Sequence, residues 1–165
     1  MLSFFHKTIF VFFFANFHPD RHSYYWEKPK KNTSKMKRIL LVEDTSHLSE
    51  EIADILRLEG YRVAIANNGL RALELLPSSR PDLIITDLLM PGMDGFELIR
   101  QVRSLASFKT IPILILSAKT SEADRIRGKV VGADAFLVKP CKAHELIASI
   151  NSLLSHKDPK AQGDD

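Results

Sequence analysis

The chain has 165 residues, which is enough for one domain with a substantial hydrophobic core. Its formal net charge of +3 arises in the first 35 residues, which hold six Lys or Arg against two Asp or Glu. The remaining residues carry 17 basic and 18 acidic side chains, so this part of the chain does not predict nucleic-acid binding. Cys141 is the single cysteine, which excludes an intrachain disulfide and is typical of a reducing compartment.

The first 35 residues differ in composition from the rest of the chain. They contain seven of the ten Phe, and their apolar stretch from Thr8 to Phe17 is too short to span a bilayer. Lys7 ahead of this stretch would suit a signal peptide, but no small-x-small cleavage site follows. The segment beginning at Met36 leads straight into the first expected strand. We therefore predict that residues 1–35 are a non-core leader, either disordered or the product of a gene start placed too far upstream.

From Lys37 onward, short apolar runs alternate with segments of helical spacing. The runs predict strands at Arg38–Glu43, Tyr61–Ala66, Leu83–Thr86, Ile113–Ser117 and Ala135–Val138. The other segments predict helices at Ser46–Leu58, at Gly69–Leu76, from Asp94 onward, at Ser121–Val130 and at Ala143–Leu154. Pro77 is expected to stop the second helix, and Asp94 is expected to cap the third. These elements predict one folded domain over residues 36–155 and a flexible tail over residues 156–165.

Five alternating strand–helix units predict an α/β fold, namely a flavodoxin-like doubly wound (βα)5 parallel sheet with strand order 2-1-3-4-5. The strands are unbroken apolar runs, as expected for parallel strands that helices cover on both faces. In this order the first and third strands are neighbours, so the residues that follow them converge at one end of the sheet. Ligands bind at the carboxyl ends of the strands in such sheets, which makes this end the candidate site.

Charged and polar residues occur where four of these strands end. Asp87 directly follows the run Leu83–Thr86, and the acidic pair Glu43-Asp44 follows the first apolar run. Lys139 follows the last strand, and Ser117 closes the fourth. Three carboxylates that converge repel one another, and one of them would keep its proton unless a cation neutralises them.

Mg²⁺ resolves this repulsion, because it binds one or two carboxylates, keeps several waters and accepts phosphate oxygens. Lys139 adds a positive charge suited to phosphate, and the Ser117 hydroxyl can hydrogen-bond to a phosphoryl oxygen. The pattern therefore predicts a phosphoryl site in which Asp87 is the nucleophile and forms an aspartyl-phosphate.

At this point the chain resembles the receiver domain of bacterial two-component response regulators. The resemblance covers about Met36–Leu154 and rests on several motifs taken together: Leu41-Val42-Glu43-Asp44, the segment Asp87–Gly95, Ser117-Ala118, Gly132-Ala133-Asp134 and Lys139-Pro140. It implies that Asp87 accepts a phosphoryl group from a sensor histidine kinase or a histidine phosphotransfer protein.

The same resemblance implies the remaining roles. Glu43, Asp44, Asp87 and the backbone carbonyl of Leu89 would hold Mg²⁺, and Ser117 and Lys139 would contact the phosphoryl group. Ser117 and Phe136 would form the switch, and the Lys139-Pro140 bond would be a cis peptide. The chain would be a cytoplasmic, stand-alone, chemotaxis-regulator-like receiver that signals by protein contact, without binding nucleic acid or membrane. It would be no enzyme beyond its own phosphorylation and dephosphorylation.

Other interpretations of these residues remain open. Asp87 and Ser117 could be turn residues, Glu43-Asp44 could cap a helix, Lys139 could be a surface lysine and Phe136 ordinary core. An Asp-nucleophile phosphatase would need an acid two residues after Asp87, where the chain has Leu89. A flavin carrier would need a hydroxyl- and glycine-rich loop after the first strand, where the acidic pair stands. The last alternative is a receiver-like interaction domain that works without phosphorylation, although every acidic and lysine position is filled.

Overall fold

The structure, a computed structural model, describes residues 36–119 and 121–155. The expectations for residues 1–35 and 156–165 lie outside the described residues. The strands are β1 (Arg38–Val42), β2 (Arg62–Ala66), β3 (Leu83–Thr86), β4 (Ile113–Ser117) and β5 (Ala135–Val138). The helices are α1 (Ser46–Leu58), α2 (Gly69–Ser79), α3 (Gly95–Ser104), α4 (Glu122–Val131) and α5 (Ala143–Ser155). Within these ranges no helix combines the length and apolar character needed to cross a membrane.

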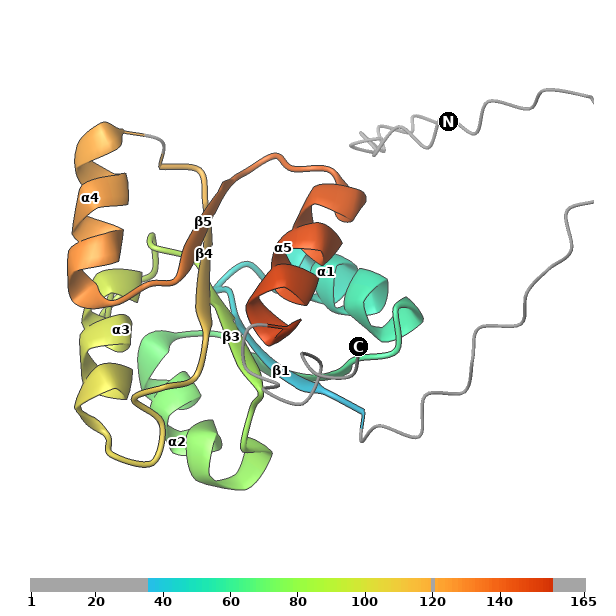
Figure 1. Cartoon of the computed structure of the whole chain (residues 1–165), viewed down its shortest axis with the longest axis horizontal. Helices are drawn as coiled ribbons and strands as arrows, with labels where there is room; N and C mark the ends of the chain where they lie inside the picture. The colour runs from blue at the N-terminus through green and yellow to red at the C-terminus, as the bar shows by residue number, and fades with distance from the viewer. Residues whose placement is uncertain (1–35, 120, 156–165) are drawn as a thin grey trace, which may run out of the picture. The chain divides into compact units, whose positions relative to one another are not determined.

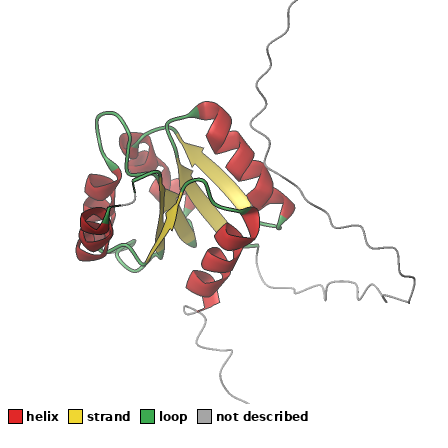
Figure 2. Cartoon of the chain, turned by 90° about the horizontal axis from the view of Figure 1, so that it is seen from above, coloured by secondary structure: helices red, strands yellow, loops and turns green. Residues whose placement is uncertain are grey.

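The strands form one parallel sheet in the order β2-β1-β3-β4-β5, which confirms the predicted fold. Helices α2, α3 and α4 cover one face of the sheet, and α1 and α5 cover the other (Figure 1). The view from above shows the same arrangement, with strands between two helical layers (Figure 2). Both faces are thus shielded from water, as parallel sheets require.

Alternation along the strands divides the core into two clusters. In β1, Leu40 and Val42 belong to the cluster beneath α2, α3 and α4, while Ile39 and Leu41 belong to the cluster beneath α1 and α5. Successive side chains of a strand point to opposite faces, so an unbroken apolar run supplies both clusters at once. This explains why the strands lack the apolar–polar alternation of a half-exposed sheet.

The prediction that Pro77 stops the second helix is wrong, because α2 continues through it to Ser79. Proline removes only one backbone hydrogen bond there, and the hydroxyls of Ser78 and Ser79 donate to the Leu75 carbonyl in the same turn. The helix instead ends at Arg80, whose φ of 42° is left-handed. The other predicted boundaries agree with the observed ones within one residue. Asp94 caps α3 as predicted, since its side chain accepts from the Glu97 N–H at 2.7 Å.

The strand register brings the predicted site residues to the same end of the sheet. Val42 of β1 pairs with Thr86 of β3, so Glu43 and Asp87 leave neighbouring strands side by side. The backbone N–H of Asp87 extends this pairing by donating to the Val42 carbonyl at 3.0 Å. On the other side, Lys139 follows β5 and donates its N–H to the Ser117 carbonyl at 2.9 Å.

Candidate functional site

The Asp87 carboxylate lies at the centre of the carboxyl end of the sheet, and the residue is 8% exposed. Its Oδ1 accepts the Ser117 hydroxyl at 2.6 Å, the Leu89 N–H at 3.1 Å and the Leu88 N–H. The loop after β3 therefore folds back over its own first carboxylate. Three donors on one oxygen fix the orientation of the group and leave Oδ2 for other partners.

Lys139 bridges two of the predicted carboxylates. Its ammonium nitrogen donates to Asp87 Oδ2 at 2.6 Å and also to Glu43 Oε2. Glu43 is 3% exposed, and its other oxygen accepts the Thr45 N–H at 3.3 Å. The structure thus gathers buried Glu43, Asp87 and Ser117 around the partly buried Lys139, so that two carboxylates meet a single ammonium.

These contacts shift the pKa of both central groups. Burial alone would raise the pKa of Asp87, but hydrogen bonds from Lys139, Ser117 and the Leu89 N–H outweigh it, so the pKa lies below its ordinary value. Burial would likewise lower the pKa of Lys139, yet its bonds to Asp87 and Glu43 raise it above the ordinary value. Asp87 is therefore a carboxylate at neutral pH and Lys139 an ammonium, which are the forms that phosphoryl chemistry needs.

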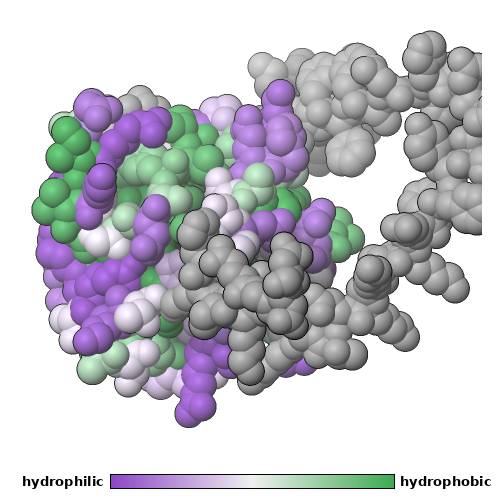
Figure 3. Space-filling view, in the orientation of Figure 1, coloured by the Kyte–Doolittle hydropathy of each residue, from purple (hydrophilic) through white to green (hydrophobic). Residues whose placement is uncertain are grey.

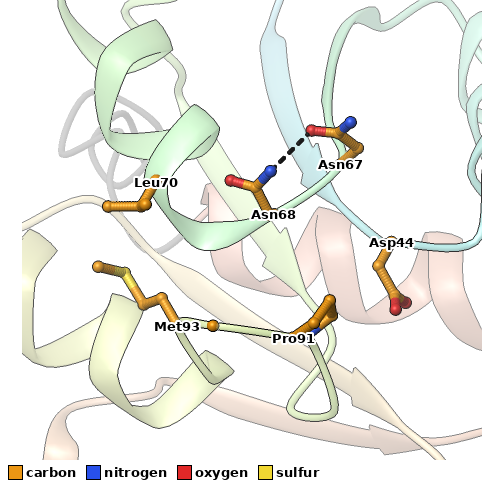
Figure 4. A pocket seen from close by; sticks show the side chains of 7 residues that line it. Asp44, Asn67, Asn68, Leu70, Pro91 and Met93 are labelled. Atoms are coloured by element: carbon orange, nitrogen blue, oxygen red, sulfur yellow. Dashed lines mark hydrogen bonds between the residues drawn. The ribbon is translucent and has the colours of Figure 1, made fainter.

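Asp44 stands apart from this cluster. It is exposed, and it lines an adjacent hollow between the loops that follow β1, β2 and β3 (Figure 4). The other lining residues are Asn67, Asn68, Leu70, Pro91, Gly92 and Met93. The dashed line in Figure 4 is the bond from the Asn68 amide to Asn67 Oδ1, at 3.1 Å. Asp44 is therefore the member of the acidic pair that solvent reaches most readily.

The carboxylate and carbonyl oxygens at this end of the sheet are chemically suited to a hard cation. Among residues 36–119 and 121–155, no three acidic, His or Cys side chains stand close enough together to hold a metal as they are arranged. The Lys139 ammonium lies between Glu43 and Asp87 and neutralises part of their charge. Carboxylate and carbonyl oxygens are nevertheless the ligands that Mg²⁺ prefers. The oxygen chemistry of these residues therefore fits Mg²⁺, although Lys139 occupies the space between two of the carboxylates.

Phe136 lies outside the cluster. It is half-buried in β5, packs against the core cluster that contains Ile115, and has the Arg125 guanidinium 5.0 Å from its ring centroid. The peptide bond between Lys139 and Pro140 is cis.

Gly95 is a site residue that sequence reasoning missed. A Cβ built on it would lie 2.1 Å from the Asp87 carbonyl oxygen, so only glycine allows α3 to begin so close to Asp87. Its N–H donates to the Leu88 carbonyl at 3.1 Å, which closes the loop. The sequence does contain a signal for this role, because Gly95 directly follows Asp94, the predicted cap of the third helix.

Fold and site together define a class of protein: an open α/β domain with a buried aspartate, a serine and a lysine at the carboxyl end of its sheet. The family model for the response regulator receiver domain matches residues 39–151. The chain therefore belongs to the response regulator receiver domain family, which confirms the resemblance drawn from its motifs. Members of this family are signalling domains of phosphorelays rather than enzymes in the ordinary sense, and their acidic pocket binds Mg²⁺.

Individual relatives agree with this assignment. The chain is 41% identical over 122 residues to the response regulator MprA of Mycobacterium leprae, covering 74% of this chain and 53% of that protein. Among solved structures, chemotaxis protein CheY4 of Vibrio cholerae has a TM-score of 0.70 at 36% identity, covering 73% of this chain and all of that one. The receiver domain of a Syntrophus aciditrophicus signal transduction histidine kinase has the same TM-score and identity, covering 78% and 98%. The chain spans about half the length of the MprA proteins it matches.

Proposed function

We propose that Asp87 is the phosphoacceptor of this receiver domain and takes a phosphoryl group from a phosphohistidine on a sensor histidine kinase or phosphotransfer protein. The observation that carries the proposal is the Asp87 carboxylate, buried at the carboxyl end of the sheet with Ser117 on one oxygen and Lys139 on the other. A turn residue would not need a partly buried ammonium and a buried hydroxyl as partners.

The transfer is a displacement at phosphorus. An Asp87 oxygen forms the new P–O bond while the P–N bond to the donor histidine breaks, and the imidazole nitrogen keeps the electron pair of that bond. The lowered pKa of Asp87 keeps its oxygens unprotonated for attack. Lys139, already within hydrogen-bond distance of Asp87, neutralises negative charge on the transferred group, and Ser117 can turn its hydroxyl to a phosphoryl oxygen.

Glu43, Asp44, Asp87 and the Leu89 carbonyl are the oxygens that would hold Mg²⁺, and the ion would supply positive charge to the phosphoryl oxygens. Buried Glu43 and exposed Asp44 flank Asp87 from the β1 side, opposite Ser117 on β4. The exposure of Asp44 supports a role for this residue in meeting an ion that arrives from solvent.

The signal passes to a protein partner through Ser117 and Phe136 to the face formed by α4, β5 and α5. When the Ser117 hydroxyl turns to the phosphoryl group, it leaves space toward which Phe136 moves, and α4 repacks. The outer surface of α4 suits a partner, because Ile126 is 56% and Val130 80% exposed. Hydrophobic atoms gather where α4 lies in Figure 1, among hydrophilic ones (Figure 3). We place this signalling in the cytoplasm, and the stand-alone arrangement stays a prediction from the sequence.

The test is covalent labelling of the full chain with acetyl phosphate and Mg²⁺. We expect one acid-stable, base-labile phosphoryl group by mass spectrometry, and its complete loss in Asp87→Asn. The control is Asp54→Asn, which removes a carboxylate of α1 that is 70% exposed and should leave the label unchanged. Labelling of Asp87→Asn at the wild-type rate would exclude Asp87, and an unlabelled wild-type protein would favour the phosphorylation-independent interaction domain.

A further inference from the structure

Helix α4 lies close to two aromatic rings at Gly128, where the helix has no side chain. A Cβ built on Gly128 would lie 3.8 Å from the ring of Phe136, 3.9 Å from that of Phe96 and 2.9 Å from Ile115 Cδ1. Gly128 is also the buried residue of this helix. Because no Cβ intervenes, the backbone of α4 can approach Ile115 of β4 and the rings supplied by α3 and β5.

Two arginines of α4 cover the same two rings. Arg125 lies over Phe136, with its guanidinium carbon 5.0 Å from the ring centroid, and Arg127 lies over Phe96 at 4.1 Å. Arg127 also stands 4.0 Å from Oδ2 of Asp94, whose other oxygen caps α3. Arg127 therefore joins the middle of α4 to the first turn of α3.

That first turn is closely attached to Asp87. The Gly95 N–H donates to the Leu88 carbonyl, and the Gly95 Cα approaches the Asp87 carbonyl so closely that no Cβ fits. Leu88 in turn donates its N–H to the Asp87 carboxylate. The partner of Arg127 is thus the loop that holds the proposed phosphoacceptor, and this connection includes neither Ser117 nor Phe136.

We propose that Arg127 is a positioning residue that holds α4 in its unphosphorylated place and opposes the response of α4 to phosphorylation of Asp87. This inference rests on the proposed function. Phe136 and Phe96 share the surface beneath Gly128, so a shift of Phe136 changes what α4 rests on and moves α4 relative to Phe96. The contact of Arg127 with Phe96 stabilises the arrangement in which it exists, and losing it is a cost of the response.

The size of this effect follows from the exposure of the groups. The Arg127 and Asp94 side chains are 49% and 45% exposed, so their ion pair contributes little in water. The guanidinium over Phe96 has the geometry of a cation–π contact, which at an exposed site changes an equilibrium constant by about two- to fivefold. Arg127→Met tests this charge, because methionine still covers part of the ring without a cation.

The experiment titrates the full chain with beryllofluoride, a phosphoryl mimic for carboxylates, at saturating Mg²⁺. It follows the backbone amide NMR signals of Glu43 at the site and of Ile126 and Val130 on α4. Arg127→Met should reach half-saturation at a beryllofluoride concentration about two- to fivefold below that of wild type. Arg127→Lys, which keeps the cation, should fall between them. The matched control is Arg71→Met, which removes a half-exposed arginine paired with Glu74 on α2, and it should titrate as wild type.

A half-saturation of Arg127→Met equal to or above that of wild type would overturn the inference and leave the proposed function standing. The same holds if the variant only unfolds at a lower temperature while its titration is unchanged, because Arg127 would then be merely structural. If the signals of wild type and all variants stay still, the proposed function fails and this inference fails with it. A half-saturation that is lowered in Arg127→Met, lowered less in Arg127→Lys and unchanged in Arg71→Met supports it.

Discussion

The two ends of the sheet both gather charged side chains, but they treat them differently. At the amino end, Arg103 donates to the carbonyls of Gly132, Lys109 and Ile111 and to the Asp134 carboxylate, which also accepts the Ile113 N–H. At the carboxyl end, two carboxylates share one ammonium. At the amino end the charges are paired and also hydrogen-bond to backbone groups. At the carboxyl end the negative side chains outnumber the positive ones.

This difference in charge pairing distinguishes a structural network at the amino end from a candidate functional site at the carboxyl end. Arg38 and Asp82 repeat the amino-end pattern, since Asp82 accepts both the backbone N–H and the side chain of Arg38. Paired charges that satisfy backbone groups stabilise a fold and leave nothing for a ligand. An unbalanced cluster can gain from a cation or a phosphoryl group, and for that reason we assign function to the carboxyl end.

The largest effect is expected from Arg103→Met. The variant loses charge-assisted hydrogen bonds to three carbonyls, two of them part-buried, and should lower the free energy of unfolding by about 2–4 kcal/mol. Denaturant unfolding measures this loss. Labelling by acetyl phosphate below the unfolding transition should stay as in wild type, because the site lies at the other end of the sheet. Loss of labelling in the folded variant would show that the two ends are not independent.

Lys139→Met should leave more uncompensated negative charge at the carboxyl end of the sheet and therefore raise its affinity for Mg²⁺. Without the ammonium, Glu43 and Asp87 face each other unpaired, so the metal-free variant should be less stable than wild type. Its Mg²⁺ affinity should rise by about tenfold, because the ion no longer competes with a nearby positive charge. Calorimetric titration measures the affinity, with exposed Lys142→Met as the control. Equal affinity in Lys139→Met and wild type would mean that the ion does not enter this cluster.

The smallest effect is expected from removing residues 1–35. Within the described residues, Arg38 at the start of β1 already pairs with Asp82. A chain that starts at Met36 should therefore have a thermal midpoint within the shift of a neutral surface change, about 0.5 kcal/mol in free energy. Calorimetry of the two chains checks this. A drop of many degrees would show that residues 1–35 add a stabilising contact to the domain.

Local sequence patterns were enough to predict the fold and to predict which polar residues would meet at the carboxyl end of the sheet. Unbroken apolar runs and helical spacing depend on neighbours along the chain, and parallel order then brings the ends of the strands together. Asp87, Glu43, Ser117 and Lys139 could be found in this way because each stands directly at the end of a strand.

Only the tertiary structure decided which side chains meet. The contact of Lys139 with Glu43 joins residues 96 positions apart, that of Arg103 with Asp134 joins residues 31 apart, and Arg127 reaches Phe96 from another helix. Such contacts depend on how the helices pack on the sheet. They cannot be predicted from local periodicity, because it describes only neighbours along the chain. The passage of α2 through Pro77 was missed for a different reason: the hydroxyls of Ser78 and Ser79 donate to the Leu75 carbonyl in the same turn, which a rule based on proline alone does not include.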